Sequence, residues 1–99
     1  STAKVNDALS TGVDLFNRGM EKAIAKNNGN VLAVRDFQNA WSQNFDPTAM
    51  QLHNAIQAKD KKEIDAIVKS VGGRGSAGAH TLAAKLKNME TLVDKGALQ

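Results

Sequence analysis

Apolar residues recur every three or four positions through the first 26 residues of the chain. This stripe consists of Val5, Leu9, Val13, Phe16, Met20 and Ile24, with Ala8 and Ala23 on the same side. Most of the polar and charged residues lie elsewhere, a pattern typical of an amphipathic helix. We therefore predict a helix over residues 2–26 whose stripe faces the core. The following Asn27-Asn28-Gly29-Asn30 ends it, because Asn and Gly tolerate left-handed backbone.

Two glycines, Gly12 and Gly19, interrupt this predicted helix. Each costs about 1 kcal/mol of helix stability relative to alanine. Two interpretations are open at this point. The glycines either permit another helix to cross closely, or they simply weaken the helix.

Three further helices follow, each with a start signal. Asn30 is the predicted cap of a helix over residues 31–44, where Phe37 and Trp41 are interpreted as core anchors. Asp46-Pro47 is a strong start for a helix over residues 47–58. Asp60, with Glu63 three positions later, resembles a capping box before a helix over residues 61–71. Their predicted apolar positions are Val31, Val34, Phe37, Trp41 and Phe45; Ala49, Leu52, His53 and Ile56, with Met50 or Ala55 at the edge; and Ile64, Ile67, Val68 and Val71.

A glycine-rich loop over residues 72–78 precedes the last predicted helix, residues 79–95. Apolar spacing defines that helix through Ala79, Leu82, Ala83, Leu86, Met89 and Val93. Gly96 is the expected residue after its end. No segment alternates with a period of two for long enough to predict a strand. We predict an all-α protein, a bundle of four or five helices in one domain over residues 1–99.

Composition and charge exclude several classes of function. The net charge of +3 is modest, and the basic cluster Lys59-Asp60-Lys61-Lys62 is interpreted as a solvated helix start, so we expect no nucleic-acid binding. The chain has no cysteine, and no apolar run approaches the roughly 18 residues of a membrane span. The first residues lack the basic-then-apolar pattern of a secretory signal. We expect a cytoplasmic protein, with export by a route that uses no cleavable signal peptide as the alternative.

The residues that could carry chemistry are few. His53 and His80 fall on different predicted helices and form no metal-binding array, so we expect neither a metal nor catalysis. Haem is not expected, because Met20, Met50 and Met89 occupy core positions and no haem attachment motif is present. The glycine-rich loop lacks the ending of a phosphate-binding P-loop. Arg74 and Ser76 at a helix N-terminus leave anion binding as the alternative to a plain connecting loop.

Residues 52–93 resemble a histidine phosphotransfer domain in the order of their features. Residues near matching places are Asp60, Ile64, Gly73, Gly78-Ala79, Leu82 and Met89-Glu90. When Gly73 is aligned, Lys69 occupies the position of the phosphorylated histidine. The resemblance therefore implies a phosphotransfer-like scaffold that cannot transfer phosphate and that binds a receiver-type signalling domain.

Residues 46–57 are similar to the hairpin region of type III secretion needle subunits. The similarity lies in Asp46-Pro47, which opens a helix, and in the Met50, Leu52 and Ala55-Ile56-Gln57 that follow. Those subunits are usually shorter and lack a glycine-rich loop, so the last third of this chain departs from the pattern. The similarity implies a self-assembling, exported structural subunit.

Our leading hypothesis from the sequence is a non-catalytic helical module that binds another protein. The candidate binding residues are Lys69, Arg74, Ser76 and His80, which lie at or near the glycine-rich loop. Self-assembly through apolar surface left on the long first helix is the first alternative. A bundle that binds a small ligand or a cofactor is the second.

Overall fold

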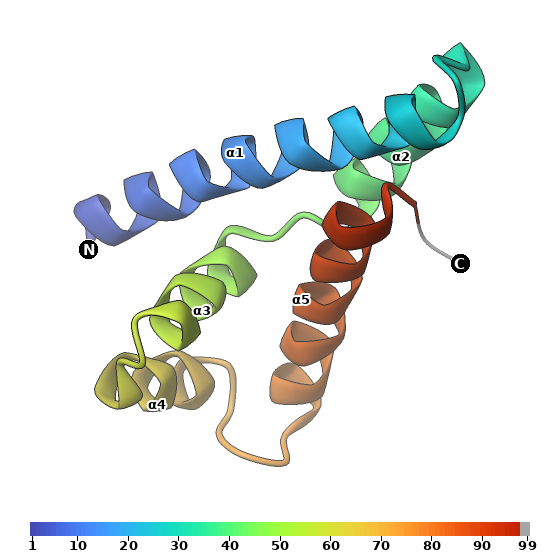
Figure 1. Ribbon diagram of the computed structural model, residues 1–99. Coiled ribbons are helices and arrows are strands. Elements are labelled where there is room, and N and C mark those ends of the chain that lie inside the picture. The colour runs from blue at the N-terminus through green and yellow to red at the C-terminus, as the bar shows by residue number, and fades with distance from the viewer. Residues whose placement is uncertain (98–99) are drawn as a thin grey trace.

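The computed structural model describes residues 1–97 and consists of five α-helices joined by short loops. They are α1 (Thr2–Lys26), α2 (Val31–Asn44), α3 (Pro47–Gln57), α4 (Lys61–Ser70) and α5 (Ala77–Lys95). Within the described residues there is no strand, so the all-α prediction is confirmed. The long α1 lies across one side of the molecule, and the other helices pack beneath or beside it (Figure 1).

Each helix begins after a residue whose side-chain oxygen accepts a hydrogen bond from a backbone N–H of the first turn. These residues are Ser1, Asn30, Asp46, Asp60 and Ser76. The sequence indicated three of them, Asn30, Asp46 and Asp60. Because Ser76 also caps a helix, α5 begins at Ala77, two residues before the predicted start. The ends of α3 and α4 each fall one residue before the predicted ends.

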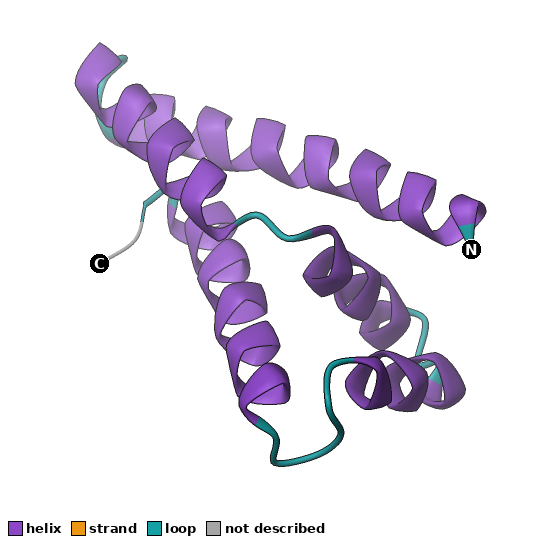
Figure 2. Cartoon of the chain, turned by 180° about the vertical axis from the view of Figure 1, so that it is seen from behind, coloured by secondary structure: helices purple, strands orange, loops and turns teal. Residues whose placement is uncertain are grey.

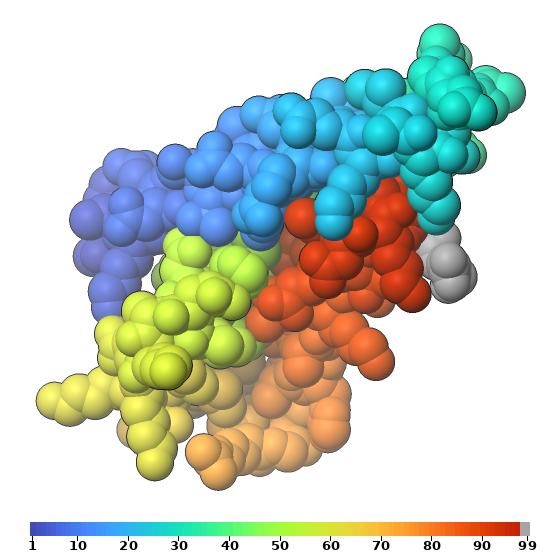
Figure 3. Space-filling view, in the orientation of Figure 1, coloured from blue at the N-terminus to red at the C-terminus, as the bar shows by residue number. Residues whose placement is uncertain are grey.

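The first half of α1 lies over α3, and its second half packs against α2 and α5 (Figures 1 and 3). After the turn that follows α1, α2 returns along the second half of α1, as the view from behind shows (Figure 2). The chain then bends at Phe45 and Asp46 and continues into α3, which packs against the first half of α1. Helix α4 packs on α3, and the glycine-rich loop connects it to α5. The molecule measures 43 × 27 × 19 Å.

The face of α1 that contacts the core is not the predicted stripe. The buried residues of α1 are Ala8, Gly12, Leu15, Gly19 and Ala23. In contrast, four large residues of the predicted stripe are exposed. Their exposed fractions are 39% for Val5, 43% for Leu9, 59% for Val13 and 43% for Ile24. At 3.6 residues per turn, the buried face lies roughly 90° around the helix from the predicted one. The prediction for α1 is therefore wrong for four of the six stripe residues, and only Phe16 and Met20 are half-buried.

Small residues form the buried face because the neighbouring helices approach α1 closely. A Cβ atom added at Gly19 would lie 2.4 Å from Cζ of Phe37 and 3.4 Å from Cα of Val93. One added at Gly12 would lie 2.7 Å from Cε1 of Phe45. Close crossing by other helices is thus confirmed at Gly19, whereas Gly12 contacts the ring of Phe45, which lies between α2 and α3.

Four aromatic residues join α1 to α2. The ring centroids of Phe16 and Phe37 are 5.6 Å apart, and those of Phe37 and Trp41 are 6.2 Å apart. Trp41 also lies 5.8 Å from Phe16 and 5.7 Å from Phe45. Phe37 is 1% exposed and Trp41 is 8% exposed, so their interpretation as core anchors is confirmed.

The remaining corrections concern single positions at the edges of the predicted apolar faces. Ile56 is exposed rather than buried, whereas Met50 and Ala55 belong to the core. On α5, Ala83 is exposed, and the fully buried Leu92 was not among the predicted positions. Val31, at the start of α2, is exposed as well. These residues lie at helix ends or at the borders of faces, where helical spacing alone does not fix the side that is covered.

We predict different consequences for alanine at the two glycines of α1. Gly19→Ala should lower the free energy of unfolding by about 1–3 kcal/mol, because the buried Phe37 ring has no room to move and overpacking outweighs helix propensity. Gly12→Ala should change it little, because the half-buried Phe45 ring can shift outward. Urea denaturation of both variants measures the difference. A Gly19→Ala variant more stable than the native protein would show that the contact with Phe37 is not tight.

Candidate functional site

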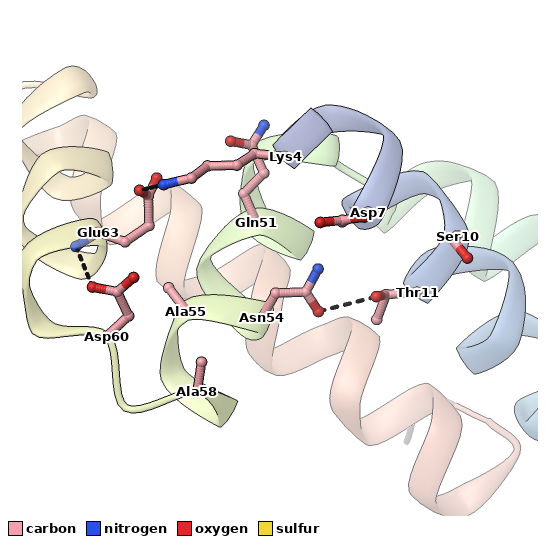
Figure 4. Close-up of a pocket in the computed structure, with 10 residues that line it drawn as sticks. All are labelled: Lys4, Asp7, Ser10, Thr11, Gln51, Asn54, Ala55, Ala58, Asp60 and Glu63. Atoms are coloured by element: carbon pink, nitrogen blue, oxygen red, sulfur yellow. Dashed lines mark hydrogen bonds and ion pairs between the residues drawn. The ribbon is translucent and has the colours of Figure 1, made fainter. Parts of the chain in front are cut away.

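A polar groove separates the first half of α1 from α3 and the start of α4 (Figure 4). We call it the α1–α3 groove, and its cavity volume is about 420 Å³. Its lining residues are Lys4, Asp7, Ser10 and Thr11 of α1, Gln51, Asn54 and Ala55 of α3, and Ala58, Asp60 and Glu63 beyond it. The groove thus presents hydroxyl, amide and carboxylate groups above a small alanine floor.

An ion pair between Lys4 and Glu63 closes one end of the groove (Figure 4). The Glu63 side chain is available for this ion pair because only one half of the predicted capping box forms. The backbone N–H of Glu63 donates to Oδ1 of Asp60 at 3.1 Å, as expected. The backbone N–H of Asp60 donates to the carbonyl of Ala55 at 2.9 Å, so it does not bond the Glu63 carboxylate. The second half of the predicted capping box is therefore absent, and the Glu63 side chain connects α4 to α1 instead.

A hydrogen bond across the floor fixes the spacing of α1 and α3. The hydroxyl of Thr11 donates to Oδ1 of Asn54 at 3.0 Å. Three carboxylates and one ammonium line the groove, so its net formal charge is negative. Its lining contains no histidine, and it can bind a polar or cationic group through hydrogen bonds. The sequence did not indicate this groove, because its residues come from three segments that only the fold brings together.

The four predicted binding residues do not form one site. Lys69 and Arg74 line a shallow depression at the end of α4, where the Arg74 guanidinium lies 3.8 Å from Asp65. Ser76 is engaged in the fold, because its hydroxyl donates to the carbonyl of Gly73 at 2.6 Å and accepts from the backbone N–H of Ala79 at 3.1 Å. His80 is exposed in the first turn of α5 and does not line the depression. The binding role of these residues stays a prediction.

The structure brings His53 of α3 next to Glu90 of α5. Their Nδ1 and Oε2 atoms are 3.2 Å apart, and 15% of the His53 side chain is exposed. Together with Arg18 and Asp94 they line a second depression beside α1. Glu90 was noted in the sequence only as part of the phosphotransfer resemblance, and its pairing with His53 depends on how α3 and α5 pack.

An apolar surface lies on the other side of the first half of α1. We call it the apolar stripe, and it consists of Val5, Leu9 and Val13. The same side of α1 is covered farther along, where Phe16 contacts Phe37 and Trp41. The stripe is open because α2 ends at Asn44, and the Phe45 ring lies beside Gly12. The apolar stripe is the first part of the row of α1 residues that the sequence predicted to face the core. It is uncovered because α2 is too short to reach it.

Within residues 1–97, no group of three or more His, Cys, Asp or Glu residues is placed to hold a metal ion. None of the helices described by the structure combines the length and the apolar character needed to cross a membrane. No family model, curated protein or solved structure matches the chain. The two family resemblances therefore stay predictions.

The Lys4–Glu63 pair gives a prediction about charge. The hydrogen bond that the Lys4 ammonium donates to the Glu63 carboxylate raises the pKa of Lys4 above its usual value. Desolvation opposes this shift, and the charges of Glu63 and Asp60 add to it. The pair's contribution to stability is thus complete below the ordinary lysine pKa and is lost as the pH rises through the raised value. In an NMR titration of the Lys4 side chain, Glu63→Gln should lower its pKa toward the ordinary value.

The matched control is Asp65→Asn, which removes an acid that pairs with Arg74 instead. It should leave the Lys4 titration unchanged. If both substitutions lowered the pKa of Lys4 equally, the total negative charge of α4 would set that pKa, and not the ion pair with Glu63.

Proposed function

We propose that this protein is a non-catalytic helical module that binds another protein through the apolar stripe on α1. The observation that carries the proposal is the exposure of Val5, Leu9 and Val13, which follow one another at intervals of four residues. Such spacing aligns three branched apolar side chains along one side of a helix. An aligned apolar row on a rigid helix suits the packing of a partner helix.

The charges of α1 support this placement. At 3.6 residues per turn, Lys4, Asp7 and Asp14 each lie roughly 140° or more around the helix from Leu9. Lys4 and Asp7 line the α1–α3 groove on that other side. The centres of protein interfaces are poor in charged residues, because a charge buried without a partner costs several kcal/mol, on the order of 3–5. The apolar stripe therefore has the composition of an interface centre.

A photo-reactive benzophenone amino acid in place of Leu9 tests the proposal in the cells that produce the protein. Irradiation should give a covalent adduct with a partner protein. The same amino acid in place of Leu32, which is 67% exposed at the start of α2, is the matched control and should give none. Absence of an adduct at position 9, or equal adducts at both positions, would rule out the stripe as the binding surface.

A second candidate surface is the depression that Lys69 and Arg74 share at the end of α4. The two basic side chains outnumber Asp65, the one acid among the described residues that line this depression, and so suit an acidic partner surface. The phosphotransfer resemblance suggests a receiver-type domain for this role. Lys69→Ala combined with Arg74→Ala should weaken binding of such a domain about tenfold, because two charge-assisted contacts are lost. Titration calorimetry measures the affinity.

The control for this second surface is Lys62→Ala combined with Arg35→Ala, which removes the same two residue types from other exposed positions. It should retain the affinity of the native protein. Equal affinities of all three proteins would exclude the depression as the contact surface, and absence of any binding would exclude the receiver-type domain.

A further inference from the structure

We propose that the partner of the apolar stripe is a second copy of this chain, and that two copies pack their α1 helices antiparallel about a two-fold axis at Leu9. This inference rests on the protein-binding function proposed above and names the partner. It concerns the contacts of α1 alone. The other four helices of each copy remain as described.

The open part of α1 has a defined length. Helix α2 covers Phe16, and Nε2 of its Gln38 lies 3.4 Å from the Met20 sulfur, so this side is covered between residues 16 and 20, while Ile24 beyond them is 43% exposed. The open part extends from Thr2 to about Val13, which is roughly 18 Å at 1.5 Å per residue. The corresponding segment of a second copy has the same length. Run antiparallel, it would fill the space without displacing α2.

The chemistry of the stripe selects against a charged partner. It carries no charged side chain, so neither an acidic nor a basic partner would find an opposite charge on it. A second copy brings an equally uncharged face. The net charge of +3 on each copy then lies away from the contact, and Lys4 and Asp7 face the α1–α3 groove. The repulsion between two copies is therefore weak at the contact itself.

The stripe is also symmetric about its central residue. Val5 and Val13 lie four residues on either side of Leu9. A two-fold axis at Leu9 places Leu9 against Leu9 and each Val5 against the Val13 of the other copy, which is the pairing of an isologous interface. Antiparallel packing also sets the helix dipoles in opposition, whereas parallel packing would bring both positive ends together.

The size of the stripe sets the strength of the association. Three side chains that are already about half-buried can cover less than the roughly 800 Å² per partner of a stable interface. The dimer should therefore be weak and reversible, and its population should depend on protein concentration.

Sedimentation equilibrium from about 10 μM to about 1 mM tests the association on purified protein. The mass should rise from the 10.5 kDa monomer toward twice that value. Leu9→Lys should weaken dimerisation about tenfold or more, because two charges would meet at the axis. Leu32→Lys, equally exposed elsewhere, should leave it unchanged. A monomeric mass throughout the range, or undiminished dimerisation of Leu9→Lys, would overturn the proposal.

Cysteine substitutions test the geometry, because the native chain has none. Helix axes about 8–10 Å apart leave roughly 3.4–5.4 Å between Cα atoms that face each other directly, and the upper part of this range suits a disulfide. Leu9→Cys should therefore oxidise to a covalent dimer faster than Leu32→Cys. A mixture of Val5→Cys and Val13→Cys should form the mixed disulfide in preference to either like pair. Preference for like pairs would overturn the antiparallel arrangement.

These experiments separate the inference from the function on which it rests. If the purified chain stays monomeric while the probe at position 9 captures a different protein in cells, the second copy is excluded and the binding function stands. If the chain stays monomeric and the probe captures nothing, both are excluded. Circular dichroism of Leu9→Lys should match the native protein, since Leu9 contributes little to the core.

Discussion

The packing of this protein depends on one close contact, in which the Phe37 ring of α2 rests against the backbone of α1 at Gly19. Only the Phe37 ring lies between the backbones of α1 and α2 there, and a Cβ atom at Gly19 would also lie 3.4 Å from the Cα of Val93 on α5. Helices α1, α2 and α5 thus meet at Gly19, where α1 has no Cβ atom. The aromatic residues of α2 can then reach Phe16 and form the aromatic cluster between α1 and α2. A bulkier residue would separate all three helices together.

This contact also explains the unusual distribution of apolar side chains on α1. Its smallest residues face the core, and several of its larger apolar residues face outward. Toward the end of the helix, α2 covers part of the outward side. Toward the beginning of α1, no other part of the described fold covers the outward side, because Asp46 and Pro47 redirect the chain into α3. The surface that we propose as an interface is therefore a direct result of tight packing elsewhere on the same helix.

The positions of the helices could be predicted because local chemistry determines them. Asn30, Asp46 and Asp60 bond the first turns of their own helices, and these bonds do not depend on tertiary contacts. The buried side of α1 could not be predicted in this way. A hydrophobicity pattern favours large apolar residues, whereas a close helix crossing selects small ones. Likewise, the pairing of Lys4 with Glu63 joins residues 59 positions apart, and no spacing in the sequence indicates it.

The end of α5 has a consequence for the order in which the chain acquires its structure. Gly96 adopts a left-handed conformation, and a Cβ there would lie 2.7 Å from the backbone nitrogen of Ala23. The ammonium of Lys22 also donates to the carbonyl of Asp94 at 3.0 Å. The end of α5 is thus fitted against a part of α1 that lies 72 positions earlier in the sequence, counted from Lys22 to Asp94. Because such distant contacts form slowly, the end of α1 around Ala23 stays uncovered until α5 has been synthesised.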